Sequence, residues 1–84
     1  MLPFDPKDCQ VEPSKHFRNT RMRKWDWDIS DLRDALERAH RIVRRGRNKL
    51  EVWTRKDGSK KLIIAYYPEE PMVLVITGTE GRSP

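Results

Sequence analysis

The chain has 84 residues, of which 37% are charged and 36% hydrophobic, and its formal net charge at pH 7 is +5. This length allows one domain with a thin core, and the composition is typical of soluble, cytoplasmic and thermostable proteins with a crowded ionic surface. The single cysteine, Cys9, excludes an intramolecular disulfide, and no apolar run is long enough to cross a membrane.

Residues 1–13 contain three prolines and scattered charge. This pattern predicts an extended or flexible N-terminal segment, followed by a single domain over residues 14–84. Ser14 follows a proline and is well placed to cap a short first helix that ends near Trp25.

A second helix is expected over about residues 30–40. Its apolar residues recur at steps of three and four and define one buried stripe, formed by Ile29, Leu32, Ala35, Leu36 and Ala39. Asp28 or Ser30 suits the N-cap, because a short polar side chain accepts hydrogen bonds from the first turn of a helix.

After the second helix the hydrophobic period changes to two, which indicates strands. The expected strands are a short one at Arg41–Arg45, then Leu50–Thr54, Lys61–Tyr67 and Met72–Thr77. The dipeptide Asp57-Gly58 is the strongest hairpin signal in the chain. The predicted fold class is therefore α+β, with one or two N-terminal helices packed on a three- to four-stranded antiparallel sheet.

A two-residue turn at Asp57-Gly58 pairs Val52 with Ile63 and so assigns the faces of the sheet. One face, which receives the second helix, carries Leu50, Val52, Ile63, Ala65, Met72, Leu74 and Ile76. The other face carries Trp53, Leu62, Ile64, Tyr66, Val73 and Val75. Because this second face is too apolar to be bare in a monomer, we expect residues 1–25, a second copy of the chain or a partner protein to cover it.

The positive charge is concentrated in three clusters. Residues 14–25 contain five lysines and arginines and no acid, residues 41–49 contain another five, and Arg55, Lys56, Lys60 and Lys61 surround the turn at Asp57-Gly58. If the clusters converge, they form a patch that attracts nucleic acid. The alternative is three solvated regions, since cations also protect the edges of sheets.

Several residues of these clusters are candidates for contact with nucleic acid. The candidate phosphate ligands are Arg18, Arg23, Lys24, Arg44, Arg45, Arg47 and Lys60. Tyr66 is suited to stacking on a base, or it forms a cross-strand aromatic cluster with Trp53. His16 is either a neutral base, because neighbouring cations disfavour its charged form, or an ordinary surface histidine. No metal-binding or cofactor motif is present, so we expect neither a metal nor a cofactor.

The motifs Ser14-Lys15-His16, Arg21-Met22 and Ile29-Ser30-Asp31-Leu32, with Ala35-Leu36, resemble the opening of a widespread family of small bacterial and archaeal proteins. That family is placed near the BrnT-type and RelE-type toxins, and the later stretches DGSKKLIIAYY and VLVITGTEG are similar to its closing hairpin. The resemblance covers residues 14–80 and implies a RelE-like fold.

Toxins of this kind cleave RNA without a metal ion, so the resemblance implies catalytic roles for His16 and Arg21. His16 would accept the proton of the ribose 2′-hydroxyl, and Arg21 with Arg18 would stabilise the charge on the phosphorus centre. Those toxins usually carry a further catalytic residue in a C-terminal segment, whereas this chain stops soon after Arg82, which favours binding over catalysis.

The sequence thus predicts a small basic cytoplasmic RelE/BrnT-like domain that binds RNA. If the domain is catalytic, the predicted activity is that of a metal-independent endoribonuclease toxin. Whether the protein is an enzyme stays open at this point. The alternative is a non-catalytic dimerisation or protein-interaction module whose partner is a second copy or an antitoxin-like protein. Neither interpretation involves a membrane or a small-molecule cofactor.

Overall fold

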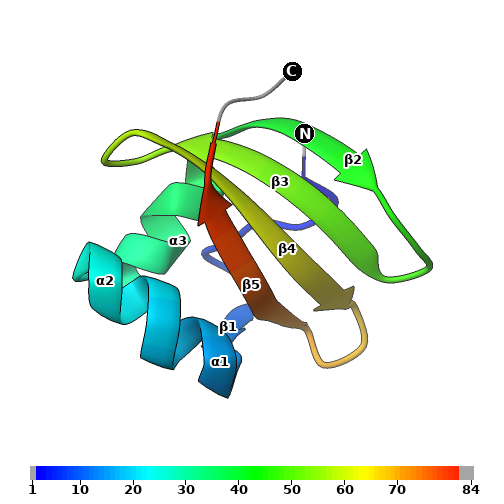
Figure 1. The fold of residues 1–84 in the computed structure, drawn as a ribbon. Coiled ribbons are helices and arrows are strands. Elements are labelled where there is room, and N and C mark those ends of the chain that lie inside the picture. The colour runs from blue at the N-terminus through cyan, green and yellow to red at the C-terminus, as the bar shows by residue number, and fades with distance from the viewer. Residues whose placement is uncertain (1, 82–84) are drawn as a thin grey trace.

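A computed structural model describes residues 2–81 of the chain. It contains one five-stranded sheet in the order β1-β5-β4-β3-β2, with the helices gathered on one side of it (Figure 1). The strands are β1 (Gln10–Pro13), β2 (Ala39–Arg44), β3 (Lys49–Arg55), β4 (Ser59–Tyr67) and β5 (Met72–Glu80). Strands β2 to β5 form an antiparallel meander, whereas β1 pairs with β5 in parallel.

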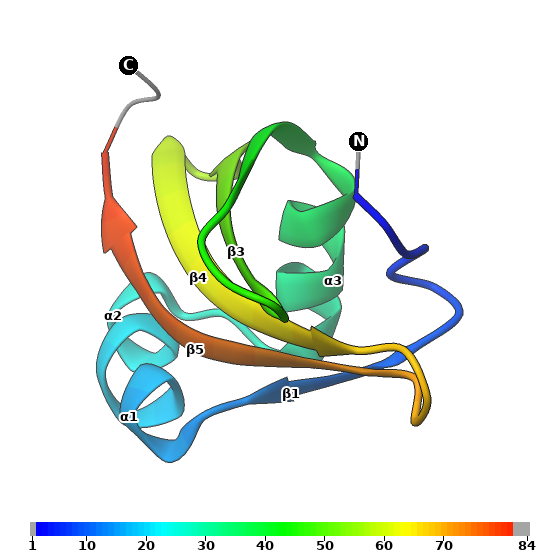
Figure 2. The same cartoon turned by 90° about the vertical axis from the view of Figure 1, so that its right-hand side faces the viewer.

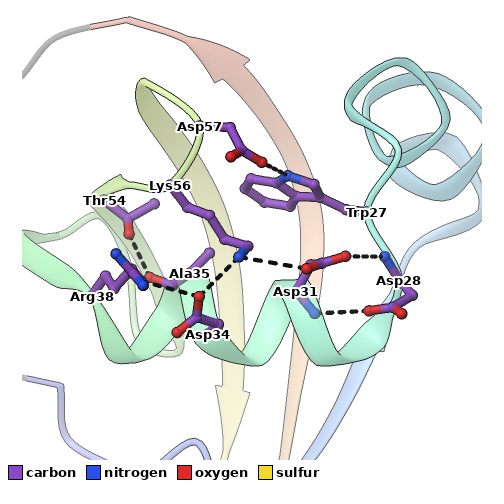
Figure 3. A network of polar contacts seen from close by, with 9 residues as sticks. All are labelled: Trp27, Asp28, Asp31, Asp34, Ala35, Arg38, Thr54, Lys56 and Asp57. Atoms are coloured by element: carbon purple, nitrogen blue, oxygen red, sulfur yellow. Dashed lines mark hydrogen bonds and ion pairs between the residues drawn. The ribbon is translucent and has the colours of Figure 1, made fainter.

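The helical residues form a continuous N-terminal stretch and one separate helix. The stretch consists of α1 (Lys15–Phe17), the π-helical turn η1 (Arg18–Met22) and α2 (Arg23–Trp25), and the separate helix is α3 (Ile29–Glu37). The Ser14 hydroxyl accepts a hydrogen bond from the backbone N–H of Phe17 at 3.1 Å, which confirms the predicted cap. Asp28 and Asp31 cap α3 reciprocally, each carboxylate accepting the other residue's backbone N–H (Figure 3).

The predicted fold class is wrong in its topology. Residues 10–13, expected to belong to an extended segment outside the domain, form β1, so a strand precedes the helices. Because β1 lies parallel to β5 (Figure 2), the sheet is mixed, and it does not have the RelE-like order of helices followed by an antiparallel sheet. Pro13 is compatible with this strand because it lies at the sheet edge, where a missing N–H disrupts no ladder.

The predicted register of the β3–β4 hairpin is wrong by one residue. Val52 pairs with Leu62 and not with Ile63, and Arg55 pairs with Ser59. The connection therefore has three residues, because Lys56 leaves the ladder and directs its ammonium group toward α3. A shift of one residue turns every side chain of β4 to the other face of the sheet.

The helices consequently pack on a face that combines Leu50 and Val52 of β3, as predicted, with apolar residues of β4 and β5 that were predicted to lie on the opposite face. The buried cluster contains Phe17, Met22, Trp27, Leu32, Ala35, Leu36, Leu50, Val52, Leu62, Ile64, Val73 and Val75. Gly78 lets the N-terminal helical stretch approach β5 closely, since an added Cβ would lie 2.8 Å from Phe17 Cε1 and 2.9 Å from Leu62 Cδ2. We call the face of the sheet that carries this buried cluster the helix-covered face, and we call the opposite face the open face.

The N-terminal residues also belong to the helix-covered face. The rings of Phe4 and Tyr66 lie 4.6 Å apart, and the Arg33 guanidinium donates hydrogen bonds to the carbonyls of Pro6 and Cys9 at 3.3 Å. Residues 2–25 therefore help to cover Leu62, Ile64, Val73 and Val75, as one of our alternatives predicted, but these residues share their face with Val52 and not with Trp53. No segment between residues 2 and 81 packs over the open face.

Candidate nucleic-acid interface

The helical stretch from Lys15 to Trp25 turns its apolar side chains inward and its cations outward. Phe17 and Met22 are buried, and the Trp25 ring packs against Phe17 with the ring centres 6.0 Å apart. The cations on the outer side are Lys15, Arg18, Arg21, Arg23 and Lys24, of which only Arg21 is half-buried. We call these five residues the basic helical surface.

The π-helical turn changes the spacing of side chains on this surface. In a π-helix the backbone hydrogen bonds join residues five apart, so residues five apart occupy neighbouring turns. Arg18 begins η1 and Arg23 follows its last residue, so two exposed arginines flank the π-helical turn. The predicted pair of His16 and Arg21 spans the junction of α1 and η1.

Within residues 2–81, however, no hydrogen bond or ion pair connects His16 with Arg21. His16 is exposed, and its polar contact is through its backbone carbonyl, which accepts a hydrogen bond from the Thr20 hydroxyl at 2.7 Å. The imidazole ring itself has no hydrogen-bond partner in the described part of the chain.

Among the described residues, Glu80 is the one carboxylate that forms an ion pair with the basic helical surface. Lys24 Nζ lies 3.1 Å from Glu80 Oε1, and this hydrogen bond is the main cause of the lowered pKa of Glu80. The charges of Lys60 and Arg21 lower the pKa of Glu80 further. Lys15, Arg18, Arg21 and Arg23 form no ion pair with any residue that the structure describes. The surface therefore retains most of its positive charge.

Among the cations near the β3–β4 hairpin, Lys56 is in contrast neutralised by α3 (Figure 3). Lys56 Nζ lies 2.8 Å from Asp34 Oδ2 and 3.5 Å from Asp31 Oδ1, and Arg38 Nε donates to Asp34 at 3.0 Å. The hydrogen bond from Lys56, followed by that from Arg38, holds the pKa of Asp34 below its ordinary value. The same contact with Asp34 raises the pKa of Lys56.

Two further side-chain contacts hold the hairpin to the helices. The Thr54 hydroxyl donates to the Ala35 carbonyl at 2.5 Å, and Trp27 Nε1 donates to Asp57 Oδ2 at 3.1 Å (Figure 3). These contacts hold Thr54 inside the helix-covered face, and in the observed register Lys56 lies beside the carboxylates of α3.

Lys60 and Tyr66, both predicted to contact nucleic acid, belong to the protein interior. Lys60 is 3% exposed, and its ammonium donates to the Asp57 carbonyl at 2.5 Å and lies 5.1 Å from the ring centre of Trp25. Tyr66 is half-buried against Phe4. The expected aromatic cluster of Tyr66 with Trp53 is wrong, because the observed register places the two rings on opposite faces.

Apart from Arg41, the second cationic cluster lies at the far end of β3, where it mainly stabilises the β2–β3 connection. Arg44 donates to the carbonyls of Gly46 and Arg47 at 3.2 and 2.7 Å, and Arg45 forms an ion pair with Glu51. Arg47 is exposed. The first and third clusters meet where Lys60 contacts Trp25. Arg41 of the second cluster lies across Trp53 from Lys61 of the third, but the other members of the second cluster lie at the opposite end of β3. The three clusters thus do not converge into one patch.

Comparison of the chain with protein-family models, with curated proteins and with solved structures gave no match. Across the residues that the structure describes, no three His, Cys, Asp or Glu side chains are grouped so that they could hold a metal ion. No helix in the same part of the chain is both long and apolar enough to span a membrane. The functional argument therefore depends on the charged surfaces themselves.

Proposed function

We propose that this domain binds RNA through the basic helical surface. The observation that supports the proposal is the excess of cations on that surface, where four of the five form no ion pair with a described residue. A surface of this kind attracts polyanions, and binding releases the counterions condensed on the nucleic acid.

The way in which the surface is held favours binding further. Phe17 and Met22 anchor the helical stretch in the core, and Ser14 fixes its first turn by also donating to the Ile76 carbonyl at 2.6 Å. Cations on an anchored helix lose less conformational freedom on binding than cations on a flexible arm. Arg18 and Arg23, which flank η1 and are both exposed, are suited to bidentate hydrogen bonds with phosphates.

Cleavage of the bound RNA is not part of the proposal. A general base is usually oriented by a second group that fixes its ring and its protonation state. His16 is exposed, and its imidazole has no such partner among residues 2–81. Incubation of the protein with labelled RNA in the presence of a chelator tests this point, and we expect the RNA to stay intact.

Binding is tested by fluorescence anisotropy with a labelled single-stranded RNA over a series of salt concentrations. About four to five phosphate contacts predict a slope of log K against log salt near −3. Arg18→Ala or Arg23→Ala should reduce the affinity about fivefold, as expected for the loss of roughly 1 kcal/mol, and should make the slope shallower by about 0.7.

Lys7→Ala is a matched control, because it removes one exposed cation that lies outside the basic helical surface and pairs with Glu37. We expect it to leave the affinity nearly unchanged. If Lys7→Ala and Arg18→Ala reduced the RNA affinity equally, binding would depend on the net charge of the protein and not on the basic helical surface. Absence of RNA binding at low salt would refute the proposed function.

A further inference from the structure

The open face of the sheet is divided into a cationic half and an apolar half. Cross-strand partners project from the same face of a sheet, so the observed pairs identify its members. The cationic half comprises Arg41, Trp53, Lys61 and Thr79 in one row and Arg55 with Ser59 in the next. The other half, which we call the apolar half, has an apolar centre formed by Val43, Ile63, Ala65, Tyr67, Met72 and Leu74. The same rows also contain Glu51, Thr77, Lys49, Glu12 and Gln10.

The cationic half combines three cations with two hydroxyl groups and contains no acid in its two rows. Arg41 lies over the ring of Trp53, with its guanidinium carbon 5.4 Å from the ring centre, and Lys61 is the partner of Trp53 on the other side. The long side chains cover the indole, which is only 6% exposed. Arg55 is exposed at the end of β3.

The apolar half begins one step further along the same strands. Ile63 follows Lys61 on β4 after one intervening residue, so the two side chains project about 7 Å apart. Ile63 and Leu74 are half-buried, although no described segment packs over them. The two carboxylates of the open face do not reverse its charge, since Glu51 pairs with Arg45 and Glu12 lies on the edge strand β1.

We propose that the open face binds a single-stranded segment of RNA, with phosphates along the cationic half and bases over the apolar half. This inference rests on the proposed function and adds a second contact surface to it. A single strand exposes phosphates and base faces together, which matches the two halves. A duplex keeps its bases stacked inside and presents chiefly phosphates to such a face.

The charge of the open face argues against a second copy of the chain as its occupant. An isologous dimer would bring the same face of both subunits together. Among the described residues each face carries two carboxylates, Glu12 and Glu51, against five cations, which are Arg41, Lys49, Arg55, Lys61 and, through its ion pair with Glu51, Arg45. Their mutual repulsion opposes that contact, whereas a polyanion is attracted by the same charges.

The test compares two substitutions on β4 for binding to single-stranded RNA and to a duplex of the same length. Lys61→Thr should weaken binding of both RNAs about fivefold and make the salt dependence shallower. Ile63→Thr should weaken binding of the single strand about fivefold, with no change in salt dependence and no change for the duplex. Ile29→Thr is the control, since Ile29 is an exposed apolar residue on α3 and should affect neither RNA.

The possible failures are distinguishable. If the wild-type protein binds RNA and Arg18→Ala weakens it, but Lys61→Thr and Ile63→Thr behave as the wild type, the open face is not used and only this inference fails. If Ile63→Thr converts a wild-type dimer into a monomer in sedimentation analysis, the open face is an interface between copies and the inference is refuted. If Ile63→Thr reduced the affinity for the single strand and for the duplex equally, the inference would also be refuted. Circular dichroism of each variant verifies that the fold is retained.

Discussion

The substitution Gly78→Ala tests how closely the N-terminal helical stretch packs on the sheet. The new methyl group would lie 2.8 Å from Phe17 Cε1, 2.9 Å from Leu62 Cδ2 and 3.3 Å from the Lys61 carbonyl oxygen. Phe17 and Leu62 are both completely buried, so neither the Phe17 ring nor the Leu62 side chain can move into solvent to make room for the methyl group. Overpacking of this kind costs about 1–3 kcal/mol. The smaller loss of chain entropy for alanine offsets about 0.4–1 kcal/mol of that cost.

The expected net effect is a loss of about 1–2 kcal/mol in the free energy of unfolding, which corresponds to roughly 4–12 °C in Tm for a domain of this size. Urea denaturation followed by circular dichroism measures it. Gly81→Ala is the matched control, because an added Cβ at Gly81 meets nothing within 4 Å. If Gly78→Ala and Gly81→Ala have the same stability, the close contact of Phe17 with β5 is wrong.

Two further predictions concern α3. Leu36→Asp puts a carboxylate at a completely buried position, at a cost of about 4 kcal/mol or more, so a soluble variant with an unchanged Tm would contradict the packing of α3 on the sheet. The pKa of Asp34 is lowered in the folded state, first by Lys56 and then by Arg38. The ionised carboxylate therefore stabilises the fold fully above its ordinary pKa of 3.8, and this stabilisation is lost as the pH falls through the lower folded-state value. Asp34→Asn should therefore flatten the acid limb of the Tm-against-pH curve, and an unchanged limb would show that the contacts of Asp34 are not formed in solution.

Elements with a strong local pattern could be predicted from the sequence. The stripe from Leu32 to Leu36 places α3 correctly, and the alternating residues of β3, β4 and β5 are confirmed as strands. The helix ends at Glu37, earlier than expected, because Ala39 already begins β2. In each case neighbours in the sequence carry the periodic signal, so no distant contact is needed to recognise it.

Strand β1 could not be predicted in the same way. It has only four residues, one of them a proline, and its partner in the sheet is β5, about sixty residues further along the chain. Val11 is 4% exposed in the structure, but a single buried valine gives no periodic pattern. Pairing of strands so distant in sequence is decided by the packing of the whole domain.

The register of the hairpin connects the error in the fold directly to the error in the predicted site. The chain has Lys60 next to Lys61 and Tyr66 next to Tyr67, so a shift of one residue leaves the kinds of side chain on the open face nearly the same. The packing of Leu62 and Ile64, which are bulkier together than Ile63 and Ala65, favours the observed register, because it buries more apolar surface beneath the helices.

That choice exchanges the roles of the two lysines. Lys60 pairs with Thr54 and is buried beside Trp25, while Lys61 pairs with Trp53 and projects from the open face. The sequence therefore predicts that a lysine and a tyrosine of β4 share a face with Trp53, but it does not determine which of each adjacent pair does so. If the open face binds RNA, Lys61→Thr and not a change at Lys60 is the substitution that should reduce the affinity in a protein that is still folded.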